Sequence, residues 1–278
     1  MVTIPLAGAA AFGWGGADYL GGRAARTAPA ITVVLLSQVI SAPILALFLA
    51  MTSAGGARPL DLVIGAVSGG FGLLGTVLLY GALATDGAAT VAPVTAVVTA
   101  LVPLIAGLFL QTAPEPLALI GAFSAVVSVA LVSKVVRGDA SKASMRTVAI
   151  AFSAGSALGL QLLLLTLPGP AAGLWPLAGA RVCSILCAAV IVLRARGKAS
   201  QTALRMPLIT LVGIFDTAAY VFYLYATSHG LLSVVGPIVS LSPVSTVLLA
   251  VIIDRERIGS LHLLGLGFAA ASLILIGL

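Results

Sequence analysis

The chain consists of about ten apolar runs in close succession, and each run is long enough to cross a lipid bilayer as a helix. A helix needs about 20 consecutive, mostly apolar residues to span the hydrocarbon core, and it satisfies its own backbone hydrogen bonds there. We therefore predict an all-α integral membrane protein with about ten transmembrane helices. The predicted spans are 3–22, 29–51, 60–84, 88–110, 116–134, 146–166, 172–193, 206–227, 231–253 and 260–278.

The composition argues against a water-soluble fold. Only 8% of the 278 residues are charged and 60% are hydrophobic, whereas soluble domains carry roughly 25% charged residues. The net charge of +6 does not indicate nucleic-acid binding, because the basic residues lie in separate short loops. Anionic lipid head groups are the expected partner of such loops. We expect a multi-pass protein of the plasma membrane (the inner membrane in a bacterium), as a monomer or weak dimer.

The longest polar segment, 135–145, lies near the middle of the chain and separates two halves, 1–134 and 146–278, with five spans each. Similar short patterns recur in the same order in both halves: Ala11-Phe12 matches Ala151-Phe152, for example. Because each half has an odd number of spans, the two halves would have opposite orientations. Inverted repeats of this kind are typical of secondary transporters, whose binding site lies between the halves near the midplane.

The basic residues also predict an orientation. Twelve of the 14 lie in loops that follow odd-numbered spans, and the other two are Arg58 and Arg181. Short loops rich in Lys and Arg face the cytoplasm, so this pattern places both termini on the outside.

Several loose motifs carry a resemblance to a known family. They are Phe-Gly-Trp-Gly at 12–15, an Ala-Thr pair followed by glycine before the fourth and ninth spans, and the acids Glu115 and Glu256 that end the fourth span of each half. With the five-plus-five layout, they make the chain similar to EamA-type members of the drug/metabolite transporter superfamily. The resemblance covers essentially the whole chain and implies transport, mostly export, of amino acids, metabolites or drugs. Many members of the family are described with both termini inside, which is the alternative to the orientation that the basic loops predict.

Three charged residues lie inside predicted spans and away from the residues that begin or end them: Asp18, Arg181 and Asp216. A charge at the centre of a membrane helix costs about 2.5–3.5 kcal/mol on insertion scales. Arg181 and Asp216 have similar depth on consecutive spans and could pair, either to fix helix register or to line a cavity. In a cavity, Arg181 would bind an anion through its fork of donors, and Asp216 would bind an amine or carry a coupling proton. Asp18 is either a second proton site or a side chain reaching the interface.

A polar stripe supports the cavity. Asp216, Tyr220, Tyr223 and Thr227 recur at helical spacing and share one face; a polar helix–helix contact is the alternative. We predict Tyr80 on the opposite wall, and Trp14 and Gln161 as further substrate contacts, although Trp14 could instead face lipid and Gln161 a neighbouring helix. Prolines within two spans predict helix kinks near the cavity: Pro93, Pro103, Pro237 and Pro243.

These observations predict a secondary transporter that exports a small amphipathic metabolite, an amino acid or drug-like molecule, by alternating access. The chain has no P-loop pattern, so the energy would come from a gradient, with protons as a candidate. No cofactor or metal site is predicted. A passive pore or structural membrane subunit is the alternative, and a membrane-embedded lipid-group transferase is less favoured because acid/base residues do not cluster.

Overall fold

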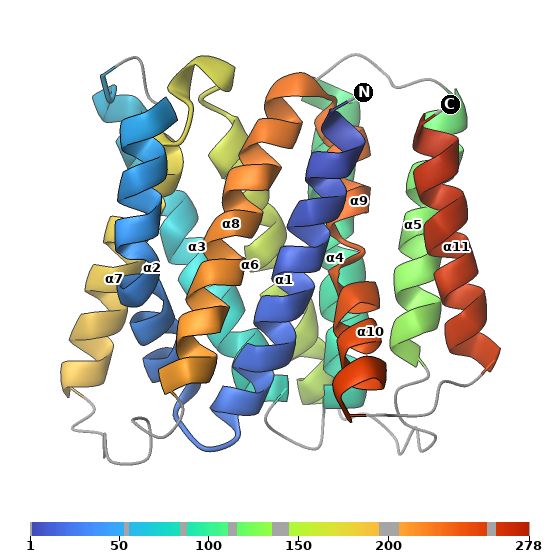
Figure 1. The fold of residues 1–278 in the computed structure, drawn as a ribbon, viewed down its shortest axis with the longest axis horizontal. Helices are drawn as coiled ribbons and strands as arrows, with labels where there is room; N and C mark the ends of the chain where they lie inside the picture. Colours follow the sequence, from blue (N-terminus) through green and yellow to red (C-terminus); the bar gives the residue numbers. More distant parts are fainter. Residues whose placement is uncertain are drawn as a thin grey trace.

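The computed structural model describes residues 2–52, 56–83, 88–110, 116–134, 145–194, 206–254 and 260–277, and these residues contain helices and no strands. The chain runs in order through the following helices (Figure 1): α1 (Thr3–Ala25), α2 (Ala30–Thr52), α3 (Pro59–Leu83), α4 (Ala88–Leu110), α5 (Pro116–Lys134), α6 (Met145–Thr166), the 3-10 turn η1 (Pro170–Ala172), α7 (Trp175–Arg194), α8 (Met206–His229), α9 (Leu232–Val239), α10 (Ser242–Asp254) and α11 (Ser260–Gly277).

Each predicted span except the ninth corresponds to one helix. Within the described residues, five helices (α2, α3, α6, α7 and α8) contain a stretch long and apolar enough to cross a membrane, and shorter apolar stretches follow in α4, α5 and α9–α10. The predicted connecting segment 135–145 lies outside the described residues except for Met145, and Glu115 and Glu256 lie outside them as well.

The ninth predicted span, 231–253, is interrupted: α9 ends at Val239 and α10 begins at Ser242. Pro243 has no amide hydrogen to donate to the carbonyl of Val239, so the helical ladder cannot continue through this point. The Ser240 amide and hydroxyl both donate to the Gly236 carbonyl, at 3.1 and 2.8 Å, and close the end of α9. The chain is therefore interrupted just before Pro243, where the sequence predicted one kinked span, whereas Pro237 lies inside α9.

The other two prolines behave differently. α4 is one helix through Pro93 and Pro103. Pro103 is buried, and its ring lies directly against Gly236 of α9, where a side chain would collide with it. The side chain of Pro93 lies outside those that the structure describes. A proline in α4 thus packs against the interrupted span of the second half.

Helices of the two halves pack on one another in a reciprocal pattern. α1, the first helix of the first half, packs on α8, the third of the second half, and α6 correspondingly packs on α3. α2 packs on α7, α4 on α9, and α5 on α11, which form a pair at one side of the bundle (Figure 1). Both termini lie at the same edge of the bundle, and the C-terminal ends of α1 and α7 lie at the opposite edge (Figure 1). The opposite orientation of the halves stays a prediction from the span count.

Large apolar side chains remain exposed on the outer surface of the bundle. Phe109 is 85% exposed, Leu193 77% and Met51 75%. In water such a surface would favour aggregation, whereas lipid tails cover it without cost. The interior is packed through small residues instead: Gly13 of α1 lies against the backbone of Phe215 and the side chain of Ala219 on α8. Small residues at helix contacts let membrane helices approach closely.

Candidate functional site

A small cavity lies between α2 and α3 of the first half and α6, α7 and α8 of the second. Its volume is about 20 Å³, which is room for ordered water and far less than a metabolite occupies. Both halves contribute side chains that carry charge or hydrogen-bonding groups to its wall. Those of the first half are Ser37, Gln38, Thr76 and Tyr80, and those of the second half are Gln161, Arg181, Ser184, Asp216 and Tyr220.

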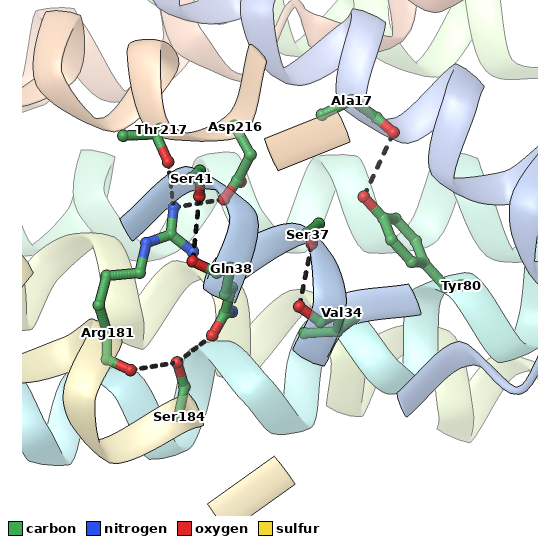
Figure 2. Close-up of polar contacts among 10 residues, drawn as sticks. All are labelled: Ala17, Val34, Ser37, Gln38, Ser41, Tyr80, Arg181, Ser184, Asp216 and Thr217. Carbon is green, nitrogen blue, oxygen red and sulfur yellow. Dashed lines mark hydrogen bonds and ion pairs between the residues drawn. The ribbon is translucent and has the colours of Figure 1, made fainter. Parts of the chain in front are cut away.

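Arg181 on α7 and Asp216 on α8 form an ion pair in this wall (Figure 2). The Nη2 atom of Arg181 lies 2.5 Å from Oδ2 of Asp216. The Arg181 side chain is 8% exposed and that of Asp216 is 23% exposed. Pairing offsets part of the cost of taking two charges out of water. Since only one nitrogen and one oxygen meet, the pair lacks the two-point geometry that arginine and carboxylate groups can adopt.

The remaining groups around Arg181 leave one donor without an acceptor. Nη2 also lies 3.4 Å from the Thr217 hydroxyl, and the guanidinium carbon lies 5.1 Å from the centre of the Tyr220 ring. That distance is within the range of a cation–π interaction. The Nε atom is buried and has no hydrogen-bond partner among the described residues. A buried donor without a partner is costly, so Nε is a candidate contact for a ligand or water.

α2 is tied to α7 on the other side of Arg181. The Ser184 hydroxyl donates to Oε1 of Gln38 (Figure 2) and lies 3.3 Å from the backbone oxygen of Arg181. Ser184 is one helical turn after Arg181, so both side chains share a face of α7. This contact joins the first half to the helix that carries the arginine.

Gln161 on α6 is the second polar group of the cavity with an unused atom. Its backbone oxygen accepts a 3.1 Å hydrogen bond from Ser68 on α3. Its side chain lies directly against Gly72, where any Cβ atom would collide with the amide. The Oε1 atom of Gln161 is buried and has no partner among the described residues. The site therefore offers an orphaned donor on Arg181 and an orphaned acceptor on Gln161.

Tyr80 and Asp18 extend the polar site towards α1. Tyr80 lines the cavity, and its hydroxyl donates to the backbone oxygen of Ala17 at 3.3 Å (Figure 2). The next residue, Asp18, is half-buried and is close enough to Asp216 for their charges to interact. Asp18 is not among the residues that line the cavity, and no basic side chain of the described residues pairs with it. Both interpretations of Asp18, a proton site and a side chain reaching the interface, stay predictions.

Some predicted site residues do not line the cavity. Tyr223 is fully buried, and its hydroxyl donates to the backbone oxygen of Leu162 on α6 at 2.9 Å. Trp14 packs edge-on against Tyr220, with ring centres 5.0 Å apart, and also contacts Tyr223 at 5.7 Å. Thr227 bonds to the backbone oxygen of Leu224 in its own helix. In this conformation Trp14 packs against the Tyr220 and Tyr223 rings outside the cavity wall. Tyr223 and Thr227 therefore match the alternative of a polar helix–helix contact.

Residues of the site that the sequence did not single out include Ser184, Thr217, Gly69 and Gly72. Ser184 lies three residues after Arg181, and this spacing could have identified it. Gly69 lies against the backbone of Ala180, so it allows α3 to approach α7 beside the arginine. The spacing of Gly65, Gly69 and Gly72 is that of a small-residue stripe on one helix face. Within the described residues, no group of three or more His, Cys, Asp or Glu side chains could hold a metal ion.

Comparison with known proteins agrees with this architecture. The model of the EamA-like transporter family matches residues 1–134 and again residues 144–278. One solved structure, described only as the crystal structure of a protein, is similar over 97% of this chain and 98% of its own, with 15% identical residues and a TM-score of 0.76. That likeness concerns the fold alone. No curated protein sequence matches. Because the family model covers nearly the whole chain in two repeats, this multi-pass membrane protein belongs to the EamA-like transporter family of the drug/metabolite transporter superfamily and is a transporter, not an enzyme.

Proposed function

We propose that the protein is a secondary transporter that exports a small amphipathic metabolite, an amino acid or drug-like molecule, by alternating access. The observation that carries the proposal is the cavity between the two halves, with Arg181 and Asp216 in its wall and unused hydrogen-bonding atoms on Arg181 and Gln161. In related folds the site lies at the interface of the repeats. The membrane in question would be the plasma membrane.

The chemistry of the wall supports a substrate with an acidic group. Arg181 would bind a carboxylate through its planar fork of donors. Gln161 would accept a hydrogen bond from the substrate, and the Tyr220 ring, already against Arg181, would contact its apolar part. Asp216 would bind an amine or carry a coupling proton, and Asp18 on α1 is the second candidate for the proton. Tyr80 closes the wall on the α3 side.

The small volume of the cavity supports alternating access over a passive pore. A pore needs a continuous polar path, whereas this cavity of about 20 Å³ holds no more than water. Substrate binding would therefore require the halves to separate at one edge. Such a movement could occur at two places. One is the interruption between α9 and α10, and the other is the contact between Pro103 of α4 and Gly236 of α9.

The proposal can be tested by a screen followed by transport in proteoliposomes. Over-expression across a set of amino acids and toxic analogues would give the substrate through raised export or resistance. Arg181→Gln and Asp216→Asn should then abolish transport while the proteins remain inserted and monodisperse. The matched controls are Cys187→Ala at an exposed position of α7 and Thr210→Val on α8, which is half-buried and does not line the cavity. Both should transport like the wild type. Wild-type rates in both site variants would exclude the assigned site.

Counterflow separates the transporter from the pore. Vesicles preloaded with unlabelled substrate should transiently concentrate labelled substrate. The site carries unlabelled substrate out of the vesicle and returns with labelled substrate bound. A pore or structural subunit would only let the label equilibrate, so the absence of any transient accumulation would favour that alternative.

A further inference from the structure

The arginine of the cavity has a counterpart in the first half of the chain. On α2, the Ser41 hydroxyl donates to the backbone oxygen of Gln38 at 3.3 Å. On α7, the Ser184 hydroxyl lies at the same distance, 3.3 Å, from the backbone oxygen of Arg181. Each half therefore has a polar side chain on its second helix, followed three residues later by a serine that contacts its backbone. Gln38 and Arg181 hold the same place in this local pattern.

The packing around these two residues is reciprocal as well. Gly69 of α3 lies directly against the carbonyl of Ala180, which immediately precedes the arginine. Gly213 of α8 lies directly against the carbonyl of Ser37, which immediately precedes the glutamine. In each case a glycine on the third helix of one half meets the second helix of the other half. Repeated halves bring equivalent positions to a shared site, and both polar residues line the cavity.

Gln38 has donors that its contact with α7 does not use. Its Oε1 atom accepts from the Ser184 hydroxyl, which leaves the two N–H groups of the amide on Nε2. Within the described residues, this Nε2 atom forms no hydrogen bond. Arg181 contacts the same serine through its backbone oxygen (Figure 2), and its Nε atom also has no acceptor among the described residues. The site therefore offers one unused donor from each half.

We propose that Gln38 is a second substrate-contacting residue, and that the substrate carboxylate binds between the Gln38 amide and the Nε atom of Arg181. This inference rests on the proposed function and adds to it a contact from the first half. A carboxylate has two oxygens and accepts from both donors at once. Arg181 stays paired with Asp216, and the uncharged glutamine completes the site without a further charge to desolvate. The bound carboxylate joins α2 to α7, so the two halves close on it together.

The test uses benzoate, a small amphipathic carboxylate, and benzamide, which has the same shape and no charge. The purified full chain is unfolded by heat in detergent at constant ionic strength, and the dependence of its melting temperature on ligand concentration gives the dissociation constant. We expect benzoate to bind the wild type more tightly than benzamide does. Gln38→Met has a similar length and no amide, so it should weaken benzoate binding about tenfold or more. Ser41→Ala, on the same helix but outside the cavity wall, should bind benzoate like the wild type.

Two further variants separate a substrate contact from a contact between helices. Ser184→Ala breaks the same hydrogen bond between α2 and α7 but keeps the Gln38 amide, so it should weaken binding less than Gln38→Met does. The double variant Gln38→Arg/Arg181→Gln moves the guanidinium group to the counterpart position. It should recover the benzoate binding that Arg181→Gln alone loses. Equal losses in Ser184→Ala and Gln38→Met would overturn the inference, and so would a folded double variant that recovers no binding.

The proposed function fails in a different way. Equal binding of benzoate and benzamide to the wild type, or undiminished benzoate binding to Arg181→Gln, would refute an acidic substrate at Arg181. Undiminished binding to Gln38→Met, with loss in Arg181→Gln, would overturn only the role of Gln38. If methionine at position 38 prevents folding, Gln38→Asn withdraws the amide by one methylene group, and the same loss of benzoate binding is expected from it.

Discussion

Arg181 of α7 and Asp216 of α8 form an ion pair at 2.5 Å, and the arginine is the more deeply buried of the two. Removal of either partner leaves the other charge unpaired in the bundle. Removal of one partner from a fully buried pair lowers the free energy of unfolding by about 3–5 kcal/mol. Because Asp216 is partly exposed, we expect a loss of about 2–3 kcal/mol here. Asp216→Asn should destabilise more than Arg181→Gln, because it leaves the more buried charge unpaired.

The double variant Arg181→Gln/Asp216→Asn provides the control for this prediction. It removes both charges, so we expect its stability to exceed that of Asp216→Asn alone. Thermal unfolding in detergent, followed by tryptophan fluorescence, measures all three variants. Losses that simply add in the double variant would mean that the two residues are not energetically coupled.

Gly72 is expected to be sensitive to the smallest possible substitution. A Cβ atom at this position would collide with the Gln161 amide, so Gly72→Ala should displace the orphaned acceptor. Overpacking of this kind costs about 1–3 kcal/mol. The matched control is Gly70→Ala on the same helix, where no atom lies within 4 Å of the added Cβ.

Alanine is the better helix former by about 1 kcal/mol, so Gly70→Ala should be neutral or stabilising. Substrate affinity should fall in Gly72→Ala and stay unchanged in Gly70→Ala, as measured by the dependence of transport rate on substrate concentration. Equal behaviour of the two variants would argue against a role for the Gly72–Gln161 contact.

The fold could be predicted because apolar run length is a strong signal in a membrane protein. The break in 231–253 could not be predicted, since a proline in a membrane helix can bend it or end it. The outcome depends on which neighbours satisfy the freed carbonyls. Here the Ser240 hydroxyl and the packing of Pro103 against Gly236 favour two separate helices, and neither contact is visible in the sequence.

The site was predictable only where charge marked it. Arg181 and Asp216 stand out because their cost in lipid demands a partner. Ser184 and Gly72 do not stand out, because serine and glycine are common in membrane helices for packing alone. The stripe of α8 placed Tyr223 with Asp216 and Tyr220, but one face of a helix can meet both a cavity and a neighbour. Tyr223 bonds to α6 instead.

Two tyrosine-to-phenylalanine substitutions should distinguish a residue that affects substrate binding from one that only stabilises the fold. Tyr80→Phe removes the hydrogen bond to Ala17 from the cavity wall, and Tyr223→Phe removes the hydrogen bond to Leu162 outside it. Both should cost about 0.5–1.5 kcal/mol of stability. Only Tyr80→Phe should alter the apparent affinity for substrate, because Tyr80 lines the cavity and Tyr223 does not. A change in affinity of the same size in Tyr223→Phe would contradict this division.

The orientation of the bundle gives the last prediction. Thr27 and Gly56 are exposed at opposite ends of α2, and the loop that contains Thr27 also carries Arg26. Since short basic loops stay in the cytoplasm, Gly56→Cys should react with a membrane-impermeant thiol reagent on intact cells, and Thr27→Cys should react only after the cells are opened. Both are made in a background with Cys183 and Cys187 replaced by alanine. The reverse labelling would place both termini in the cytoplasm and would show that the basic loops do not determine the orientation of this protein.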